Sequence, residues 1–131
     1  MEVSFEKWQK LLEIGIRYLG ENNSVDAEEY LKASLVEAEL LAVPVIIAFS
    51  QRLFSTAQVR NNKLGEAESG FSKALKICLE LNNKKGIAEA KAGLASISFL
   101  RKQYSESIRL YKEAISIYPS NSSPLRLAAL Y

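Results

Sequence analysis

The sequence predicts an all-α fold: a right-handed α-solenoid of three helix-turn-helix repeats followed by a C-terminal helix. Two observations support this prediction. The 131-residue chain aligns with itself twice when it is shifted by 40 residues. Within each copy, apolar residues recur three and four positions apart, which is the spacing of one face of an α-helix. No segment alternates apolar and polar residues as a half-buried strand does.

The repeat is recognisable because residue size is kept at equivalent positions of the three copies. The columns of large residues are Ile14, Phe54 and Leu94; Leu19, Val59 and Phe99; and Leu31, Phe71 and Tyr111. The columns of small residues are Gly15, Ser55 and Ala95, and Ala27, Ala67 and Ser107. Small residues let two helices approach closely while large ones fill the neighbouring space. We expect the small columns to mark helix crossings inside each repeat, and stacked repeats to share a core.

A single domain over residues 1–131 is expected, because a chain of this length can bury one core. Its repeats should span about 5–43, 44–83 and 84–121, with a terminal helix within 122–131. The expected helices are 5–20, 24–41, 44–60, 64–81, 84–101, 104–118 and 123–131.

In the first repeat, Leu11, Ile14 and Tyr18 supply the apolar spacing of the first helix. The polar segment 20–23 then separates the two helices. Ser24 is expected to cap the second helix, because a hydroxyl there can accept a hydrogen bond from a free backbone N–H.

The later repeats show the same division. Polar turns at 61–63 and 101–103 separate their helices. Pro44 and Pro124 suit the first turn of a helix, where a missing N–H donor costs nothing. Residues 119–131 therefore predict a turn followed by the first helix of a fourth unit, which caps the array, continues it, or contacts another chain.

Several stretches of the second and third copies resemble the tetratricopeptide repeat family. They are Leu64–Ala67, Phe71, Lys73–Leu75, Leu94–Ala95, Lys102–Ser107, Leu110–Ala114 and Pro119. The repeat is longer than the usual form of about 34 residues. The family's tryptophan near the start of each unit is missing, and Trp8 is out of place. The resemblance implies an extended variant of that solenoid, whose first helices line a concave surface.

The composition excludes most chemistries. The chain has no histidine, so it has no imidazole metal ligand and no histidine-based catalytic triad. Its only cysteine, Cys78, can form neither an intrachain disulfide nor a zinc-binding cysteine pair, and its spacing predicts a packing role. The glycines are scattered and do not form a phosphate-binding loop. We expect no catalytic, cofactor or metal site, and hence no enzyme.

Neither a membrane nor a nucleic acid is expected as a partner. No apolar run approaches the roughly 20 residues that a membrane helix needs, and the N-terminus does not resemble a secretory signal. These features predict a cytoplasmic location. The net charge of +2 is too small to indicate nucleic-acid binding.

The sequence predicts a protein–protein interaction scaffold or adaptor that holds a partner peptide or helix in its concave groove. First-helix residues not used inside a repeat would form an apolar strip with a few charges, which suits such a segment. The proposed contacts are Leu12, Ile16, Phe49, Arg52, Thr56 and Phe99. The apolar residues supply desolvated area, and Arg52 would orient a polar or acidic group. The column containing Phe99 has an alternative role as core between repeats.

Two other functions remain open. Residues 1–40 carry nine acidic and four basic side chains, whereas residues 81–131 carry eight basic and three acidic ones. Opposite charge at the two ends, or the apolar segment 123–131, would allow a homo-oligomer to form as a self-assembling structural unit. The chain could also serve as a sensory repeat segment of a larger regulatory protein.

Overall fold

The computed structural model describes residues 5–117, and that part of the chain is a stack of helices without strands. The helices are α1 (Phe5–Gly20), α2 (Ser24–Leu41), α3 (Pro44–Arg60), α4 (Leu64–Glu80), α5 (Lys84–Leu100) and α6 (Tyr104–Ile117). Their bounds agree with the prediction to within one residue. The helix expected at 122–131 lies outside the described residues.

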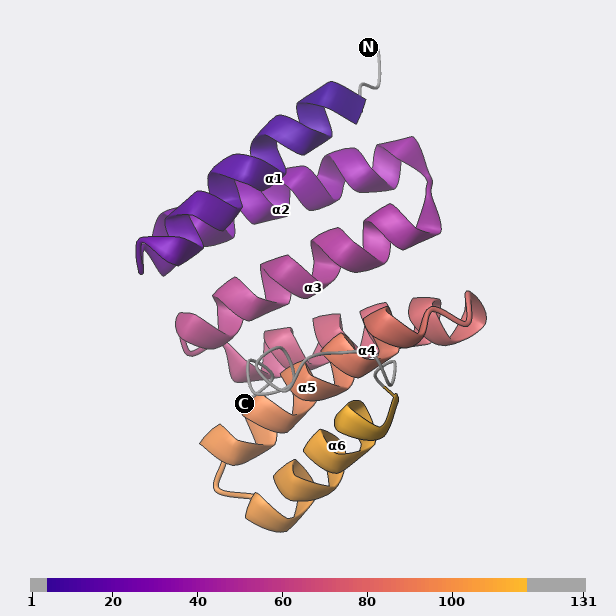
Figure 1. Cartoon of the computed structure of the whole chain (residues 1–131). Coiled ribbons are helices and arrows are strands. Elements are labelled where there is room, and N and C mark those ends of the chain that lie inside the picture. Colours follow the sequence, from indigo (N-terminus) through magenta and orange to yellow (C-terminus); the bar gives the residue numbers. More distant parts are fainter. Residues whose placement is uncertain (1–4, 118–131) are drawn as a thin grey trace.

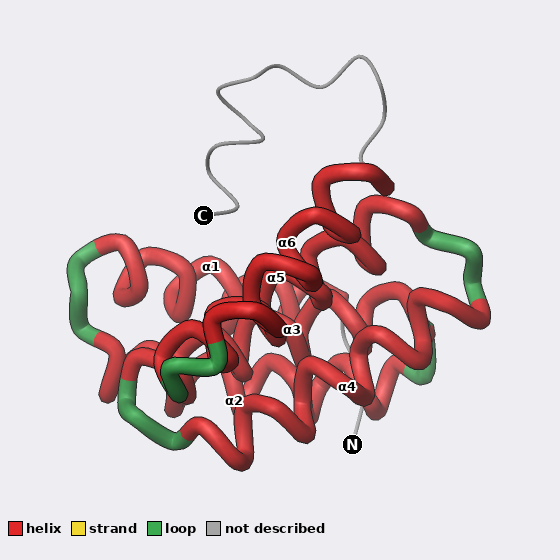
Figure 2. Tube along the Cα trace, turned by 90° about the horizontal axis from the view of Figure 1, so that it is seen from below, coloured by secondary structure: helices red, strands yellow, loops and turns green. Residues whose placement is uncertain are grey.

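The helices stack in chain order, so each packs against the next one (Figure 1). Contacts between α3 and α5, and fewer between α1 and α3, join the first helices of successive repeats. Viewed from below, α1, α3 and α5 lie on one side, and α2 and α4 on the other (Figure 2). This two-layered stack is the all-α solenoid that the repeat predicts.

The turns explain why the repeat is 40 residues long. Each of the five turns contains one non-glycine residue with positive φ, namely Asn22, Ala42, Asn62, Asn82 and Lys102. These residues recur every 20 positions, so one helix with its turn is half a repeat. A residue in this left-handed conformation ends a helix by turning its last carbonyl groups toward later backbone N–H groups. The N–H of Asn23, for example, donates to the carbonyl of Tyr18 at 2.9 Å.

The cap of α2 differs from the prediction. Asn23, not Ser24, is the N-cap, and its side-chain oxygen accepts a hydrogen bond from the N–H of Asp26 at 3.3 Å. The Ser24 hydroxyl instead donates to the side-chain oxygen of Asn61 at 2.6 Å. Ser24 therefore joins the first repeat to the second and does not cap its own helix.

The small columns occur where two helices touch, as predicted. A Cβ atom added to Gly15 would come within 2.6 Å of the Leu31 side chain across the α1–α2 crossing. Ala27 and Ala67 are completely buried, and Ser107 is nearly so. The Ser107 hydroxyl donates to the carbonyl of Ala95 at 2.9 Å, which satisfies this buried polar group inside the third repeat.

Candidate interaction groove

A pocket of about 350 Å³ opens between the first helices of the three repeats, toward the start of α3 and α5. We call it the groove pocket. Its lining includes Trp8, Ala48, Phe49, Arg52, Cys78 and Glu89. Residues from α1, α3, α4 and α5 therefore meet in one hollow, although they are spread over more than half of the sequence.

The floor of the groove pocket is apolar and rigidly held. Ala48 and Cys78 are buried in one core cluster. Trp8 is also buried, and its indole Nε1–H donates to the Ser50 hydroxyl at 2.7 Å. This hydrogen bond satisfies two buried polar groups and fixes the indole ring against α3. The floor is thus a preformed surface of the kind that accepts an apolar side chain.

The rim of the groove pocket carries a paired charge. Arg52 on α3 and Glu89 on α5 form an ion pair, with 2.7 Å between Nη2 and Oε2. The Arg52 guanidinium also lies 5.2 Å from the centre of the Phe49 ring. Both interactions hold Arg52 over the mouth of the pocket, and the ion pair ties the second repeat to the third.

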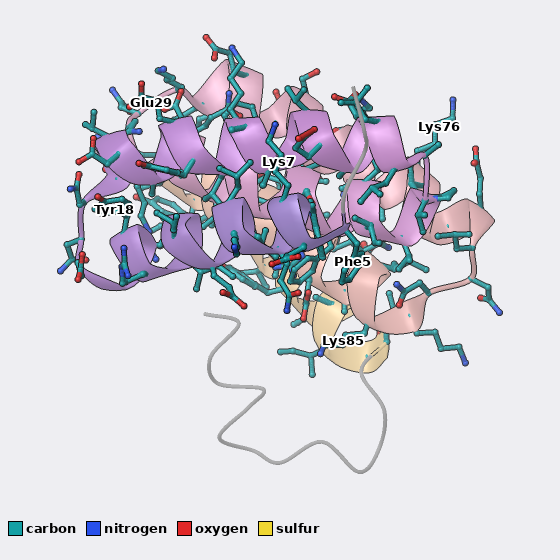
Figure 3. All side chains as sticks on the ribbon, turned by 90° about the horizontal axis from the view of Figure 1, so that it is seen from above. Phe5, Lys7, Tyr18, Glu29, Lys76 and Lys85 are labelled. Atoms are coloured by element: carbon teal, nitrogen blue, oxygen red, sulfur yellow. The ribbon has the colours of Figure 1, made fainter. Side chains whose placement is uncertain are left out.

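A glycine keeps the α5 side of the groove pocket open. The side-chain oxygen of Asn83 accepts a hydrogen bond from the N–H of Gly86 at 3.2 Å, which caps α5. A Cβ atom on Gly86 would lie 2.5 Å from the Cys78 sulfur. A side chain at position 86 would therefore displace Cys78 from the floor. Lys85, labelled in Figure 3, is exposed beside it.

The chemistry of the groove pocket favours binding. Burial raises the pKa of the Cys78 thiol; Arg52 lowers this pKa and Glu89 raises it, with smaller effects. A thiol with a raised pKa is a poor nucleophile near neutral pH, because the reactive form is the thiolate. Within residues 5–117, no group of three or more acidic, histidine or cysteine side chains could hold a metal ion. None of the helices described combines the length and apolar character needed to cross a membrane.

The structure brings together only part of the predicted contact set. Phe49 and Arg52 line the groove pocket. Thr56 lies one turn beyond Arg52 on α3, and its hydroxyl donates to the Arg52 carbonyl at 2.9 Å. Ile16 is exposed on α1 but does not line the groove pocket.

Two further predicted contacts lie outside the groove pocket. Leu12 is only 6% exposed and lies in the core cluster with Trp8, because α3 covers that face of α1. Phe99 is exposed but lines a different pocket, where its ring meets the edge of Tyr104 at 5.6 Å between centroids. Arg52, which was expected to orient a group of the partner, is paired with Glu89 within the protein.

Trp8, Cys78 and Gly86 also line the groove pocket, and none of them was predicted to belong to the site. The column that contains Trp8 continues with Ala48 and Ala88. One bulky residue followed by two alanines indicates that the tryptophan fills space between repeats. Gly86 gave a weaker signal, since a glycine near a helix start is common.

Comparison with known proteins places the fold. No family model matches the chain, and no curated protein matches it. Among solved structures, the TPR domain of Arabidopsis FLU superposes with a TM-score of 0.77 at 22% identity, covering 85% of this chain and 93% of that one. Aspartyl phosphate phosphatase F from Bacillus subtilis superposes with a TM-score of 0.81 at 16% identity, covering 89% of this chain and 31% of the phosphatase chain.

This chain therefore spans about a third of the length of the phosphatase. Both matches show the fold, which is the tetratricopeptide-type helical repeat that the sequence resemblance implied.

Proposed function

We propose that this tetratricopeptide-type solenoid is a protein-interaction module whose groove pocket receives one large apolar side chain of a partner segment. The observation that carries the proposal is the preformed hollow between α1, α3 and α5, with an apolar floor and a charged rim. A rigid apolar pocket with a few placed polar groups is the usual form of a specific binding site. TPR-type folds generally bind protein partners, which supports the same assignment.

Phe49 and Arg52 supply the contacts with the partner segment. Phe49 is 39% exposed, so it has apolar area left to bury against a partner. Arg52 keeps N–H donors beyond those used for Glu89, and these can bind the backbone carbonyl groups of an extended or helical segment. Because Glu89 compensates the charge of Arg52, Arg52 by itself does not select for an acidic partner.

A random peptide library displayed on phage tests the proposal. We expect selection against the protein to enrich peptides that share one large apolar residue. Phe49→Glu should weaken their binding about tenfold or more, because a buried charge would face the anchor. The double variant Phe49→Glu with Arg52→Glu should abolish it.

The matched control is Leu79→Glu, which changes an equally apolar but more exposed residue on α4, outside the groove pocket. This variant should keep wild-type affinity, and all variants should show the wild-type circular dichroism spectrum. Peptides that bind Phe49→Glu as tightly as the wild type would contradict the groove assignment. We assign this binding role to the cytoplasm, where a lone thiol such as Cys78 stays reduced.

A further inference from the structure

A second hollow, of about 400 Å³, lies at the opposite end of the molecule from α1 and α2. We call it the end face. It is lined by Phe99 of α5 and by Tyr104, Ile108, Tyr111 and Lys112 of α6. Three of its side chains are more than half exposed: Phe99 at 57%, Ile108 at 55% and Tyr104 at 52%. Large apolar side chains gathered in this way mark an interaction surface.

We call the contacts between the first and second repeats and between the second and third repeats the inner junctions. They show which helix covers the residues equivalent to those of the end face. Tyr104, Ile108 and Tyr111 follow Leu64, Glu68 and Phe71 by one 40-residue repeat. Leu64 and Phe71 pack under Leu94 and Ile97 of α5. The first helix of the next repeat therefore covers this face of α4.

The glutamate in this column has a constant role at the inner junctions. Glu68 pairs with Arg101 at the end of α5 at 3.1 Å, and Glu28 pairs with Lys63 after α3 at 2.6 Å. At the third position of the column the chain carries Ile108. A surface that faced only water would favour a polar residue here, yet the substitution makes the end face more apolar.

The other end of the stack shows the opposite change. Ile47 and Ile87 pack into the core where α3 and α5 meet the preceding helices. The equivalent residue of α1 is Lys7, which pairs with Glu37 at 2.9 Å. In Figure 3, which looks down on α1 and α2, Lys7 lies over this pair of helices. The end of the stack formed by the first repeat is therefore charged, whereas the end face, formed by the third repeat, is mainly apolar.

Two lysines flank the end face. Lys112 lines the hollow, and Lys102 stands in the turn between Phe99 and Tyr104. Arg109 is already engaged by Glu106 and Glu113. Residues 118–131 contain one arginine and no carboxylate side chain, so they do not supply the complementary charge.

We propose that the end face binds an acidic amphipathic helix of another protein, which lies on α6 as α5 lies on α4. Apolar residues at i, i+3 and i+7 of that helix cover Tyr104, Ile108 and Phe99, and its carboxylates face Lys102 and Lys112. This site is separate from the groove pocket, so the molecule has two interaction surfaces.

A peptide derived from α5, the helix that covers α4, tests the proposal. The probe is residues 84–101 with Lys84→Glu, Lys85→Glu, Lys91→Glu and Arg101→Leu, which keeps Ile87, Leu94 and Ile97 and makes the peptide acidic. The control peptide carries only Arg101→Leu. Fluorescence anisotropy with the full chain should show saturable binding of the acidic peptide, about fivefold or more tighter than the control at low salt.

Ile108→Glu restores the residue type of the inner junctions and should lower the affinity about tenfold. Lys112→Glu should remove the preference for the acidic peptide, while Leu79→Glu should leave the affinity for both peptides unchanged. Thermal unfolding followed by circular dichroism checks that each variant is folded. Failure of the peptide to bind, or equal affinity for Ile108→Glu, overturns the proposal.

Two further results would also overturn it, because they assign the end face to another occupant. Tighter peptide binding by Leu127→Glu with Leu130→Glu would mean that the chain's own residues 118–131 compete for the surface. A wild-type dimer in light scattering that Ile108→Glu converts to a monomer near 14.6 kDa would mean that a second copy occupies it.

Discussion

Arg52 and Glu89 form an ion pair that crosses from the second repeat to the third, with 2.7 Å between Nη2 and Oε2. Their side chains are only 19% and 20% exposed, so water screens the pair weakly. The pair fixes the spacing of α3 and α5 at the mouth of the groove pocket, and it therefore contributes to both the shape and the stability of the site.

A double-mutant cycle measures this contribution. We expect Arg52→Ala and Glu89→Ala each to lower the free energy of unfolding, with a coupling of about 1 kcal/mol between them. Urea denaturation of the wild type, the two single variants and the double variant gives this coupling. Strictly additive changes in the free energy of unfolding would mean that the ion pair does not stabilise the contact between the two repeats.

Two glycines inside helices, Gly93 and Gly65, make opposite predictions about close packing. A Cβ atom on Gly93 would overlap the Phe71 ring, whereas a Cβ atom on Gly65 would meet no atom within 4 Å. Gly93→Ala should therefore lower the free energy of unfolding by about 1–3 kcal/mol. Gly65→Ala should raise it by about 0.5 kcal/mol, because alanine favours the helix. Thermal unfolding of both variants provides the comparison, and equal signs would contradict the packing described here.

Ala42 ends α2 with φ 58° and ψ 32°, a conformation that glycine adopts more easily than alanine does. Ala42→Gly should raise the free energy of unfolding by about 0.5–1 kcal/mol, since it relieves the steric cost of the left-handed region. Ala33→Gly, the same change inside α2, should lower it by about 1 kcal/mol. Urea midpoints that shift in the same direction for both variants would argue against the turn geometry.

Glu28 predicts a loss of stability in acid. Burial tends to raise the pKa of Glu28, but hydrogen bonds from Lys63 and Asn61 outweigh it and hold the pKa below its ordinary value of 4.5. A carboxyl whose folded pKa is lowered stabilises the protein above its unfolded pKa, and this stabilisation disappears as the pH falls through the folded pKa.

The wild type should therefore lose more stability between pH 7 and about pH 3 than Glu28→Gln does, by about 1 kcal/mol or less. Urea midpoints at the two pH values measure the difference. The neighbouring exposed residue supplies the control, and Glu29→Gln should respond to pH as the wild type does. An unchanged acid response in Glu28→Gln would mean that the Lys63 and Asn61 contacts do not stabilise the charged carboxylate.

The helix bounds could be predicted because they depend on local signals. The turns recur every 20 residues, and three of the five described turns hold an asparagine at the position of positive φ, a residue type that tolerates this conformation. The small columns depend on periodicity alone, so Gly15 and Ala67 were placed correctly. The cap of α2 was not, because both Asn23 and Ser24 can cap a helix. The contact of Ser24 with Asn61, 37 residues away, decides between them.

The site was less predictable, because it depends on how repeats are rotated relative to one another. Phe49 and Arg52 could be found from the unused face of α3. Leu12 shares such a face on α1, but α3 covers it. Phe99 is close to the end of α5, and the tight turn at Lys102 brings Tyr104 back against its ring. The contact between Phe99 and Tyr104 could not be predicted from the spacing of apolar residues in the first helices.

The most direct test of the groove pocket as a binding site is to locate a library-selected peptide by the chemical shifts of the protein's amide groups. We expect addition of the peptide to shift the signals of Ala48, Phe49, Arg52, Gly86 and Glu89, and Phe49→Glu to remove these changes. Shifts confined to α2 and α4, or shifts that persist in Phe49→Glu, would contradict the claim that the groove pocket is the binding site.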